Sequence, residues 1–264
     1  MSATVDIVIP VYNEEEDLPR SVLTLTGFLR DNLGNPWRII IADNASTDGT
    51  RQVSEILCQK YPGAHYFYLP EKGRGRALRA AWLESTADIV SYMDVDLSTD
   101  LAHFPQLIEA LESGYHIAIG SRLSRDSQVT RSFKRESVSR SYNLMIRSLF
   151  FTSFQDAQCG FKALTRQTAQ AIVPHIKNNN WFFDTELLII AAKRGYRIKS
   201  VPVKWDDDPG TTVKVFRTAT EDIKGLLRLR FGGIPKVAPP DGAALSGDVS
   251  DVGSVRTRQD KSKA

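Results

Sequence analysis

The chain contains few of the residues that build disulfide frameworks or clustered metal sites: its 264 residues include two cysteines and four histidines. Cys58 and Cys159 lie far apart, so we expect no disulfide, and a reducing cytoplasm is the expected compartment. The histidines show no ligand spacing. No apolar run reaches the roughly 18 residues of a membrane-spanning helix, and no charged-then-apolar leader precedes the apolar residues 4–9. We therefore expect a chain that does not cross a membrane but is able to lie on one.

The chain also lacks a strong net charge. Lys and Arg number 34 against 31 Asp and Glu, which leaves a formal charge of only +3. No global field favours nucleic acid as a partner, and the positive charge that exists is local. The sequence is 42% hydrophobic, which fits a globular domain. We predict a folded domain over residues 1–235 and a disordered tail over 236–264, where Pro, Gly, Ser, Asp and Lys dominate.

Strand-like and helix-like patterns alternate along the first half of the chain. The expected strands are 5–10, 37–42, 64–69, 88–93, 116–119, 163–164 and 198–203. The expected helices are 14–30, 50–60, 75–85, 101–112, 182–194 and 212–230. Residues 121–150 form a basic, helical stretch. This rhythm predicts an α/β fold with a mostly parallel central sheet flanked by helices.

Two carboxylates stand where one expected strand stops. Asp94 and Asp96 follow the apolar residues 87–93, at the strand edge where open α/β sheets bind ligands. Two acids one residue apart repel each other, and a divalent cation bound to phosphate would relieve that repulsion. Oxygen ligands suit Mg²⁺ or Mn²⁺. The alternative is a strand end followed by a helix cap, because Ser-Thr-Asp follows this motif.

Polar residues also follow the first two strands. Tyr12 and Glu14 come after the first, and Asp43 comes at the end of the second, so all three are able to contact a base or a ribose. The alternative is turn and cap chemistry, which explains Asn13 and Asp48 well.

A glycine-rich basic loop, Lys72-Gly73-Arg74-Gly75-Arg76, precedes an expected helix. Its glycines allow the backbone to approach a phosphate, and a helix N-terminus adds positive potential. The Gly-Lys-Ser/Thr of a Walker loop is absent. The alternative is a basic surface turn.

A second group of basic residues suits an anionic acceptor, because arginine pairs bidentately with phosphate oxygens. Its members are Arg122, Arg125, Arg131, Lys134, Arg135, Arg140 and Arg147. The alternative for any one of them is an ordinary solvated surface.

Five segments occur in a recognisable order: Pro-Val-Tyr-Asn-Glu, Asp-Asn-Ala-Ser-Thr-Asp-Gly-Thr, Lys-Gly-Arg-Gly, Asp-Val-Asp and Gly-Phe-Lys. Over residues 5–230 the chain resembles inverting family 2 glycosyltransferases of the GT-A fold. It is most similar to the polyprenyl-phosphate (dolichyl-phosphate) hexose synthases. The resemblance implies transfer of a hexose from a nucleotide diphosphate sugar to a lipid phosphate.

The resemblance also assigns roles residue by residue. The donor-binding residues that it implies are Pro10, Tyr12, Glu14, Asp43, Lys72 and Gly73, with Asp94 and Asp96 on the metal and diphosphate. The acceptor-phosphate residues that it implies are Arg122, Arg131, Arg135 and Ser139, with Asp156 as an acid beside the acceptor. For Asp184, a structural role at a helix N-terminus and a role in the active site are equally expected.

The chain departs from the family pattern in three ways. Asn44 stands where a second acid is common, Ser98 stands where many mannosyl members carry Gln, and the membrane helices of several relatives are missing. The Ser98 departure puts a side-chain metal ligand at that position in doubt.

The segments Trp-Phe-Phe-Asp-Thr-Glu and Asp-Ala-Gln-Cys-Gly-Phe-Lys look most like the glucosyl branch. UDP-glucose is therefore the first expected donor, GDP-mannose the second and an N-acetylhexosamine donor the third. One alternative is a soluble glycosyltransferase with a sugar, glycerate or polysaccharide acceptor. Another is a non-catalytic sugar-nucleotide-binding partner of a membrane complex, against which the intact Asp-x-Asp argues.

Residues 212–230 place apolar side chains at near-helical spacing among basic ones. An amphipathic helix packed on the sheet explains this pattern. The alternative is a helix at a membrane interface, drawn to anionic headgroups. With that alternative, the protein would be cytoplasmic and peripheral at the inner face of the membrane.

Overall fold

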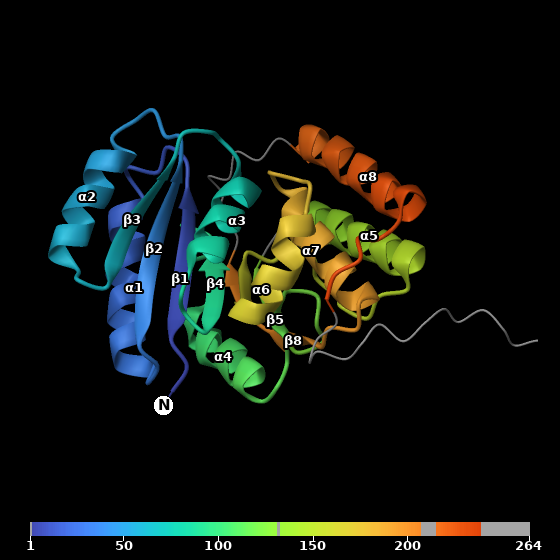
Figure 1. Ribbon diagram of the computed structural model, residues 1–264, viewed down its shortest axis with the longest axis horizontal. Helices are drawn as coiled ribbons and strands as arrows, with labels where there is room; N and C mark the ends of the chain where they lie inside the picture. The colour runs from blue at the N-terminus through green and yellow to red at the C-terminus, as the bar shows by residue number, and fades with distance from the viewer. Residues whose placement is uncertain (1, 131–132, 207–214, 239–264) are drawn as a thin grey trace, which may run out of the picture.

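The computed structural model describes residues 2–130, 133–206 and 215–238 (Figure 1). Its main sheet has seven strands in the order β3-β2-β1-β4-β7-β5-β8. These strands are β1 (Val5–Val11), β2 (Trp37–Asn44), β3 (Ala64–Leu69), β4 (Ile89–Met93), β5 (Ile117–Ser121), β7 (Phe161–Thr165) and β8 (Ile198–Pro202). A second sheet pairs β6 (Gln128–Thr130) with β9 (Lys204–Asp206).

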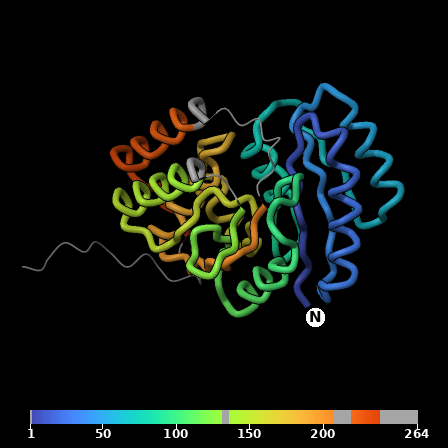
Figure 2. Tube along the Cα trace, turned by 180° about the vertical axis from the view of Figure 1, so that it is seen from behind, coloured from blue at the N-terminus to red at the C-terminus, as the bar shows by residue number. Residues whose placement is uncertain are grey.

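The α-helices cover both faces of the main sheet. They are α1 (Leu18–Asn32), α2 (Thr50–Lys60), α3 (Arg74–Glu84), α4 (Phe104–Glu112), α5 (Phe133–Phe150), α6 (Arg166–Ile172), α7 (Phe182–Lys193) and α8 (Val215–Gly232). Alternate residues of β1 belong to two cores. Ile7 is part of the core that includes buried residues of α1, α2 and α4, and Val8 is part of the core that includes buried residues of α3 and of α5 to α8. The α5 and α8 helices lie side by side, away from β1 to β3 (Figure 1, Figure 2).

The predicted mostly parallel sheet is confirmed. Strands β1 to β4 are parallel, and so are β5 and β8, whereas β7 runs antiparallel to both β4 and β5. The reversal of β7 matters for the site. Met93, the last residue of β4, pairs with Phe161, the first of β7. The loop that leads into β7 therefore meets the carboxyl ends of the other strands.

Some expected boundaries were wrong. The helix expected from residue 14 begins at Leu18, because Asn13 adopts a left-handed conformation (φ 58°) and Pro19 stands in the first helical turn. The stretch 121–150 is not helical throughout, because β6 precedes α5. Of the predicted tail, residues 236–238 are described: Val237 is buried and the Ala238 carbonyl accepts from Tyr196 Oη (2.6 Å). Residues 239–264 lie outside the described part.

Candidate active site

Asp94 directly follows β4 and lies close against Gly160. Its backbone N–H donates to the Gly160 carbonyl (3.2 Å), and a Cβ added at Gly160 would collide with the Asp94 carboxylate. A side chain at position 160 would therefore displace the Asp94 carboxylate, so glycine serves close approach here rather than unusual backbone angles. The Asp94 side chain stays 41% exposed at the sheet edge. Asp96 is also partly exposed, and its Oδ1 accepts from the Ser98 backbone N–H (3.0 Å).

These two acids suit a divalent cation that shares its ligands with a substrate. Among the described residues, no group of three His, Cys, Asp or Glu side chains is arranged to hold a metal alone. Mg²⁺ sites often use one or two carboxylates and leave the remaining positions to phosphate oxygens and water. Asp94 and Asp96 therefore fit Mg²⁺ or Mn²⁺ if a diphosphate completes the site.

Glu14 confirms that negative charge gathers here. The pKa of its carboxyl is raised to about 7, first by burial and then by repulsion from Asp17, Asp96, Asp48 and Asp94. Such an accumulation favours a bound cation.

The nucleoside-side residues predicted from sequence line the same edge of the sheet. Asp43 is fully buried and accepts from the Ser46 N–H (2.9 Å) and from Tyr66 Oη (2.8 Å). The Lys72 ammonium lies 3.1 Å from the centre of the Tyr12 ring. Pro10 is partly buried at the end of β1. Asp43 thus shapes the turn after β2 in this structure, whereas Tyr12 and Lys72 lie together.

Asn44 explains a departure from the family pattern. Its Nδ2 donates to the Val11 carbonyl (2.5 Å), and its Oδ1 accepts from the Gly73 N–H (2.9 Å). An ionised acid at this position is unable to donate to a carbonyl. The amide therefore fastens the Lys72-Gly73 loop to the ends of β1 and β2.

A buried polar network centred on Asp184 contacts Asp94 through Arg74. Asp184 accepts from Lys162 Nζ (2.9 Å), Tyr92 Oη (2.5 Å) and Arg74 Nη1 (2.6 Å). Burial alone would raise the pKa of Asp184, but Lys162 and Arg74 hold it below its usual value. Arg74 Nη2 also donates to Asp94 Oδ1 (2.8 Å). Sequence reasoning left Asp184 undecided and missed the role of Arg74, although the motif containing it was identified.

Arg122 and Asp156, both predicted on the acceptor side, form a buried ion pair. Arg122 Nε and Nη2 donate to the two Asp156 oxygens (2.8 and 3.0 Å), and the Arg122 N–H donates to Oδ2 (3.0 Å). Asp156 is completely buried, and burial raises its pKa, but Arg122 lowers it more. The Arg122 guanidinium also faces the Trp205 ring at 5.5 Å.

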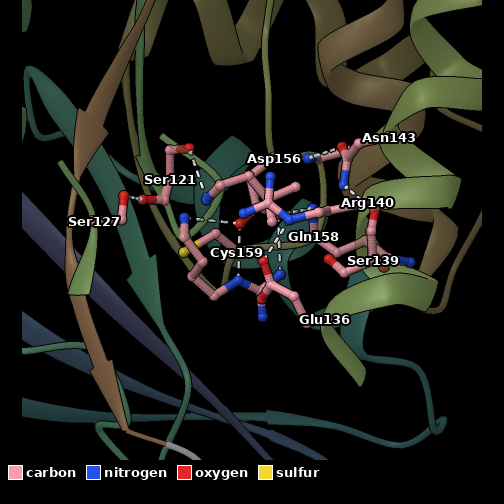
Figure 3. A network of polar contacts seen from close by, with 12 residues as sticks. Ser121, Ser127, Glu136, Ser139, Arg140, Asn143, Asp156, Gln158 and Cys159 are labelled. Carbon is pink, nitrogen blue, oxygen red and sulfur yellow. Dashed lines mark hydrogen bonds and ion pairs between the residues drawn. The ribbon is translucent and has the colours of Figure 1, made fainter. Parts of the chain in front are cut away.

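Helices α5 and α8 hold the Asp156 loop in place. Figure 3 shows Asn143, from α5, beside the loop that contains Asp156. Asn143 Oδ1 accepts from the Ala157 N–H (2.9 Å), and Gln158 Nε2 donates to Asp222 Oδ2 (3.1 Å). Burial raises the pKa of Asp222 to about 6. Neither Asn143 nor Asp222 stood out in the sequence, because both contacts join segments distant in the chain.

The other acceptor-side predictions are only partly visible. Ser139 lies on α5, and its buried Oγ has no hydrogen-bond partner in the described structure. Arg135 belongs to the first turns of α5, but its side chain is outside the described part, and Arg131 lies outside the described residues altogether. Burial raises the pKa of Cys159 to about 12, which excludes it as a thiolate nucleophile near neutral pH.

Comparison with known proteins now identifies the family. Residues 6–173 match the model of glycosyl transferase family 2. The chain belongs to this family. It is 33% identical over 225 residues to glycosyltransferase AglD of Haloferax volcanii. The match covers 84% of this chain but only 35% of AglD. It is 28% identical to a dolichyl-phosphate beta-glucosyltransferase of Dictyostelium discoideum, over 85% of this chain and 73% of that protein.

A solved structure supports the same fold. Glucosyl-3-phosphoglycerate synthase of Mycobacterium tuberculosis, in complex with UDP, superposes with a TM-score of 0.66 at 22% identity, covering 89% of this chain and 82% of that one. The fold is therefore GT-A. The match to glycosyl transferase family 2 shows that the protein is a glycosyltransferase. Within the described residues, no helix is both long and apolar enough to span a bilayer.

Proposed function

We propose that this glycosyltransferase moves glucose from UDP-glucose to dolichyl or another polyprenyl phosphate, with inversion at the anomeric carbon and with Mg²⁺ or Mn²⁺ held by Asp94 and Asp96. The observation that carries the proposal is the meeting of the two halves of the site at one sheet edge. The Asp94 N–H donates to the Gly160 carbonyl, and Gly160 lies on the same loop as Asp156, the ion-pair partner of Arg122. The relatives named dolichyl-phosphate beta-glucosyltransferase support both the sugar and the acceptor.

The acceptor chemistry needs little proton transfer. A phosphate monoester is mostly ionised near neutral pH, because its second pKa is about 6, so it attacks the anomeric carbon without a strong base. The main barrier is bringing two anions together. A bound divalent cation would neutralise the departing diphosphate. We expect Arg122 to offer the acceptor its Nη1, because Asp156 accepts from Nε and Nη2 and fixes the plane of the guanidinium.

Donor binding is the first test of this proposal. In titrations followed by calorimetry, we expect UDP to bind about tenfold more tightly with Mn²⁺ than with EDTA, because Asp94 and Asp96 would hold the metal and its charge would neutralise the diphosphate. We also expect UDP to bind more tightly than GDP, as the resemblance to the glucosyl branch implies. Equal affinity with and without Mn²⁺ would contradict the metal site, and a preference for GDP would favour the mannosyl alternative.

The membrane part of the proposal rests on α5 and α8. Helix α8 has two kinds of surface: Leu226 and Leu229 are buried, and Gly225 lies against Phe182 of α7, as expected for a helix packed on the core. Other apolar side chains of the two neighbouring helices and their ends remain exposed. This α5/α8 surface consists of Val138, Leu144, Phe151, Ile223, Leu227 and Phe231.

Basic residues accompany this surface. Arg147, Lys224 and Arg230 are exposed on the same two helices. Phe151 and Phe231 are 84% and 81% exposed, and such high exposure is unusual for phenylalanine side chains. Exposed apolar side chains and exposed cations on the same two helices suit the interface of an anionic bilayer, where the lipid phosphate acceptor would lie. A cytoplasmic, peripheral location at the inner membrane face follows from this proposal.

We expect reversible binding to vesicles that contain anionic lipid, weakened by salt because each basic residue contributes about 1 kcal/mol at most. Flotation at low and high salt measures it. The double variant Phe151→Ser/Phe231→Ser should float several-fold less. Leu23→Ser provides the control, because Leu23 is 56% exposed on α1, away from α5 and α8. If wild-type protein does not float at low salt, the membrane contact is wrong and the soluble-acceptor alternative gains support.

A further inference from the structure

Arg74 holds together two carboxylates from different elements, Asp94 at the end of β4 and Asp184 in the first turn of α7. Its Nη1 lies 2.6 Å from Asp184 Oδ2, and its Nη2 lies 2.8 Å from Asp94 Oδ1. The guanidinium is enclosed by the rings of Tyr92 and Trp181, at 4.7 and 4.9 Å. Only 12% of the Arg74 side chain is exposed. Its position is therefore fixed by charge and by packing.

The two carboxylates differ in what else supports them. Asp184 is buried and keeps Lys162 and Tyr92 as partners whether or not Arg74 is present. Asp94 is 41% exposed, and among the described residues Arg74 is its one ion-pair partner. The contact between Arg74 and Asp184 therefore holds the guanidinium in place. A ligand is able to replace Asp94 as the second partner of Arg74.

The charges in this network balance without a metal. Lys162 and Arg74 are positive, and Asp184 and Asp94 are negative. A divalent cation placed on Asp94 and Asp96 would stand close to the Arg74 guanidinium, and two like charges at such a distance repel strongly in a partly desolvated site. A diphosphate bound with the metal removes this conflict, because it brings negative charge that Arg74 is able to neutralise.

We propose that Arg74 is a positioning residue that makes metal binding depend on the donor: it pairs with Asp94 in the free enzyme and changes to the diphosphate when metal and nucleotide arrive together. This inference rests on the proposed function, since it assumes a metal and a nucleotide diphosphate at Asp94 and Asp96. A planar guanidinium suits the role, because one nitrogen stays on Asp184 while the other exchanges partners.

The test separates metal binding from nucleotide binding. Electron paramagnetic resonance of free Mn²⁺ measures binding of the metal alone, and calorimetry with UDP at saturating Mn²⁺ measures the nucleotide. For Arg74→Gln we expect Mn²⁺ alone to bind about tenfold more tightly, because a repelling charge is gone, and UDP about tenfold more weakly. These opposite changes are not produced by general damage to the site, which weakens both.

Two variants serve as controls. Arg76→Gln removes the same charge two residues along α3, where Arg76 pairs with Glu71 and not with Asp94, and it should change neither affinity by more than about twofold. Arg74→Lys keeps the charge and should leave the Mn²⁺ affinity near that of wild type. If glutamine at position 74 prevents folding, Arg74→Met makes the same charge change and keeps the aliphatic contact with Tyr92 and Trp181.

The outcomes are distinguishable from those of the proposed function. If wild-type protein binds Mn²⁺ and UDP but the neutral variant binds Mn²⁺ no more tightly, the role of Arg74 is refuted and the donor site stands. If wild-type protein binds neither ligand, the metal-dependent donor site is refuted and the inference falls with it.

Discussion

Asp96→Asn is expected to reduce sugar transfer by about a thousandfold, because it removes one of the two carboxylates available to the metal and half of the charge that holds it. Asp96 lies at the sheet edge, partly exposed, and its Oδ1 contact with the Ser98 N–H is one that an amide oxygen also makes. The variant should therefore remain folded. Initial rates with a short polyprenyl phosphate, together with circular dichroism, measure both effects.

Asp100→Asn is the matched control for this prediction. Asp100 is exposed four residues further on and caps a short helical turn by accepting from the Ala102 N–H (3.0 Å). Removing its charge changes the field near the site but takes no ligand from the metal, so activity should stay within about twofold of wild type. Full activity of the Asp96 variant, or of wild-type enzyme in EDTA, would show that the metal hypothesis is wrong.

Arg122→Ala is expected to destabilise the protein by roughly 3–5 kcal/mol and to abolish most transfer, because it leaves the completely buried Asp156 carboxylate without its ion-pair partner. Urea unfolding measures the loss of stability. Arg140→Ala is the control: Arg140 forms an exposed ion pair with Glu136 one turn away on α5, and such pairs contribute only about 0.3–0.5 kcal/mol.

The effect of Arg122→Ala should depend on pH, with a predictable sign. In wild type, Arg122 holds the pKa of Asp156 below its usual value, so the pair stabilises the fold above the ordinary carboxyl pKa and loses that effect as the pH falls through the lowered pKa. In the variant, the guanidinium no longer opposes the effect of burial, so this pKa rises, although the backbone N–H groups of residues 122 and 158 still donate to the carboxylate. The stability difference from wild type should therefore shrink as the medium becomes more acid. If the stability difference between wild type and variant is constant between pH 4 and 8, Asp156 is not the carboxylate that loses its ion-pair partner.

The sequence predicted the regular elements where local signals were strong. Residues 50–60 and 64–69 were expected as a helix and a strand with the bounds of α2 and β3, because Gly and Pro punctuate a clear change of periodicity there. The pair β6 and β9 was missed because each strand has only three residues and depends on a partner far along the chain. The start of α1 was misplaced because a left-handed Asn13 leaves no clear mark in the sequence.

The site illustrates the same limit. Asp94, Arg122 and Asp156 were identified from their motifs, but the sequence did not indicate that Arg122 would pair with Asp156 or that Gly160 would leave room for Asp94. Both contacts depend on β7 running antiparallel between β4 and β5. The roles of Arg131 and Arg135 in acceptor binding stay predictions. Their side chains are not part of the described structure.

The most direct test of the whole account is a transfer assay with the full chain, Mn²⁺ and anionic lipid vesicles, read by mass spectrometry of the products. UDP-glucose and GDP-mannose are each offered with dolichyl phosphate and, separately, with 3-phosphoglycerate. The account predicts a β-linked dolichyl phosphate glucose from UDP-glucose, formed only with metal. No glycosylated lipid phosphate from either donor, or sugar transfer to 3-phosphoglycerate alone, would contradict it.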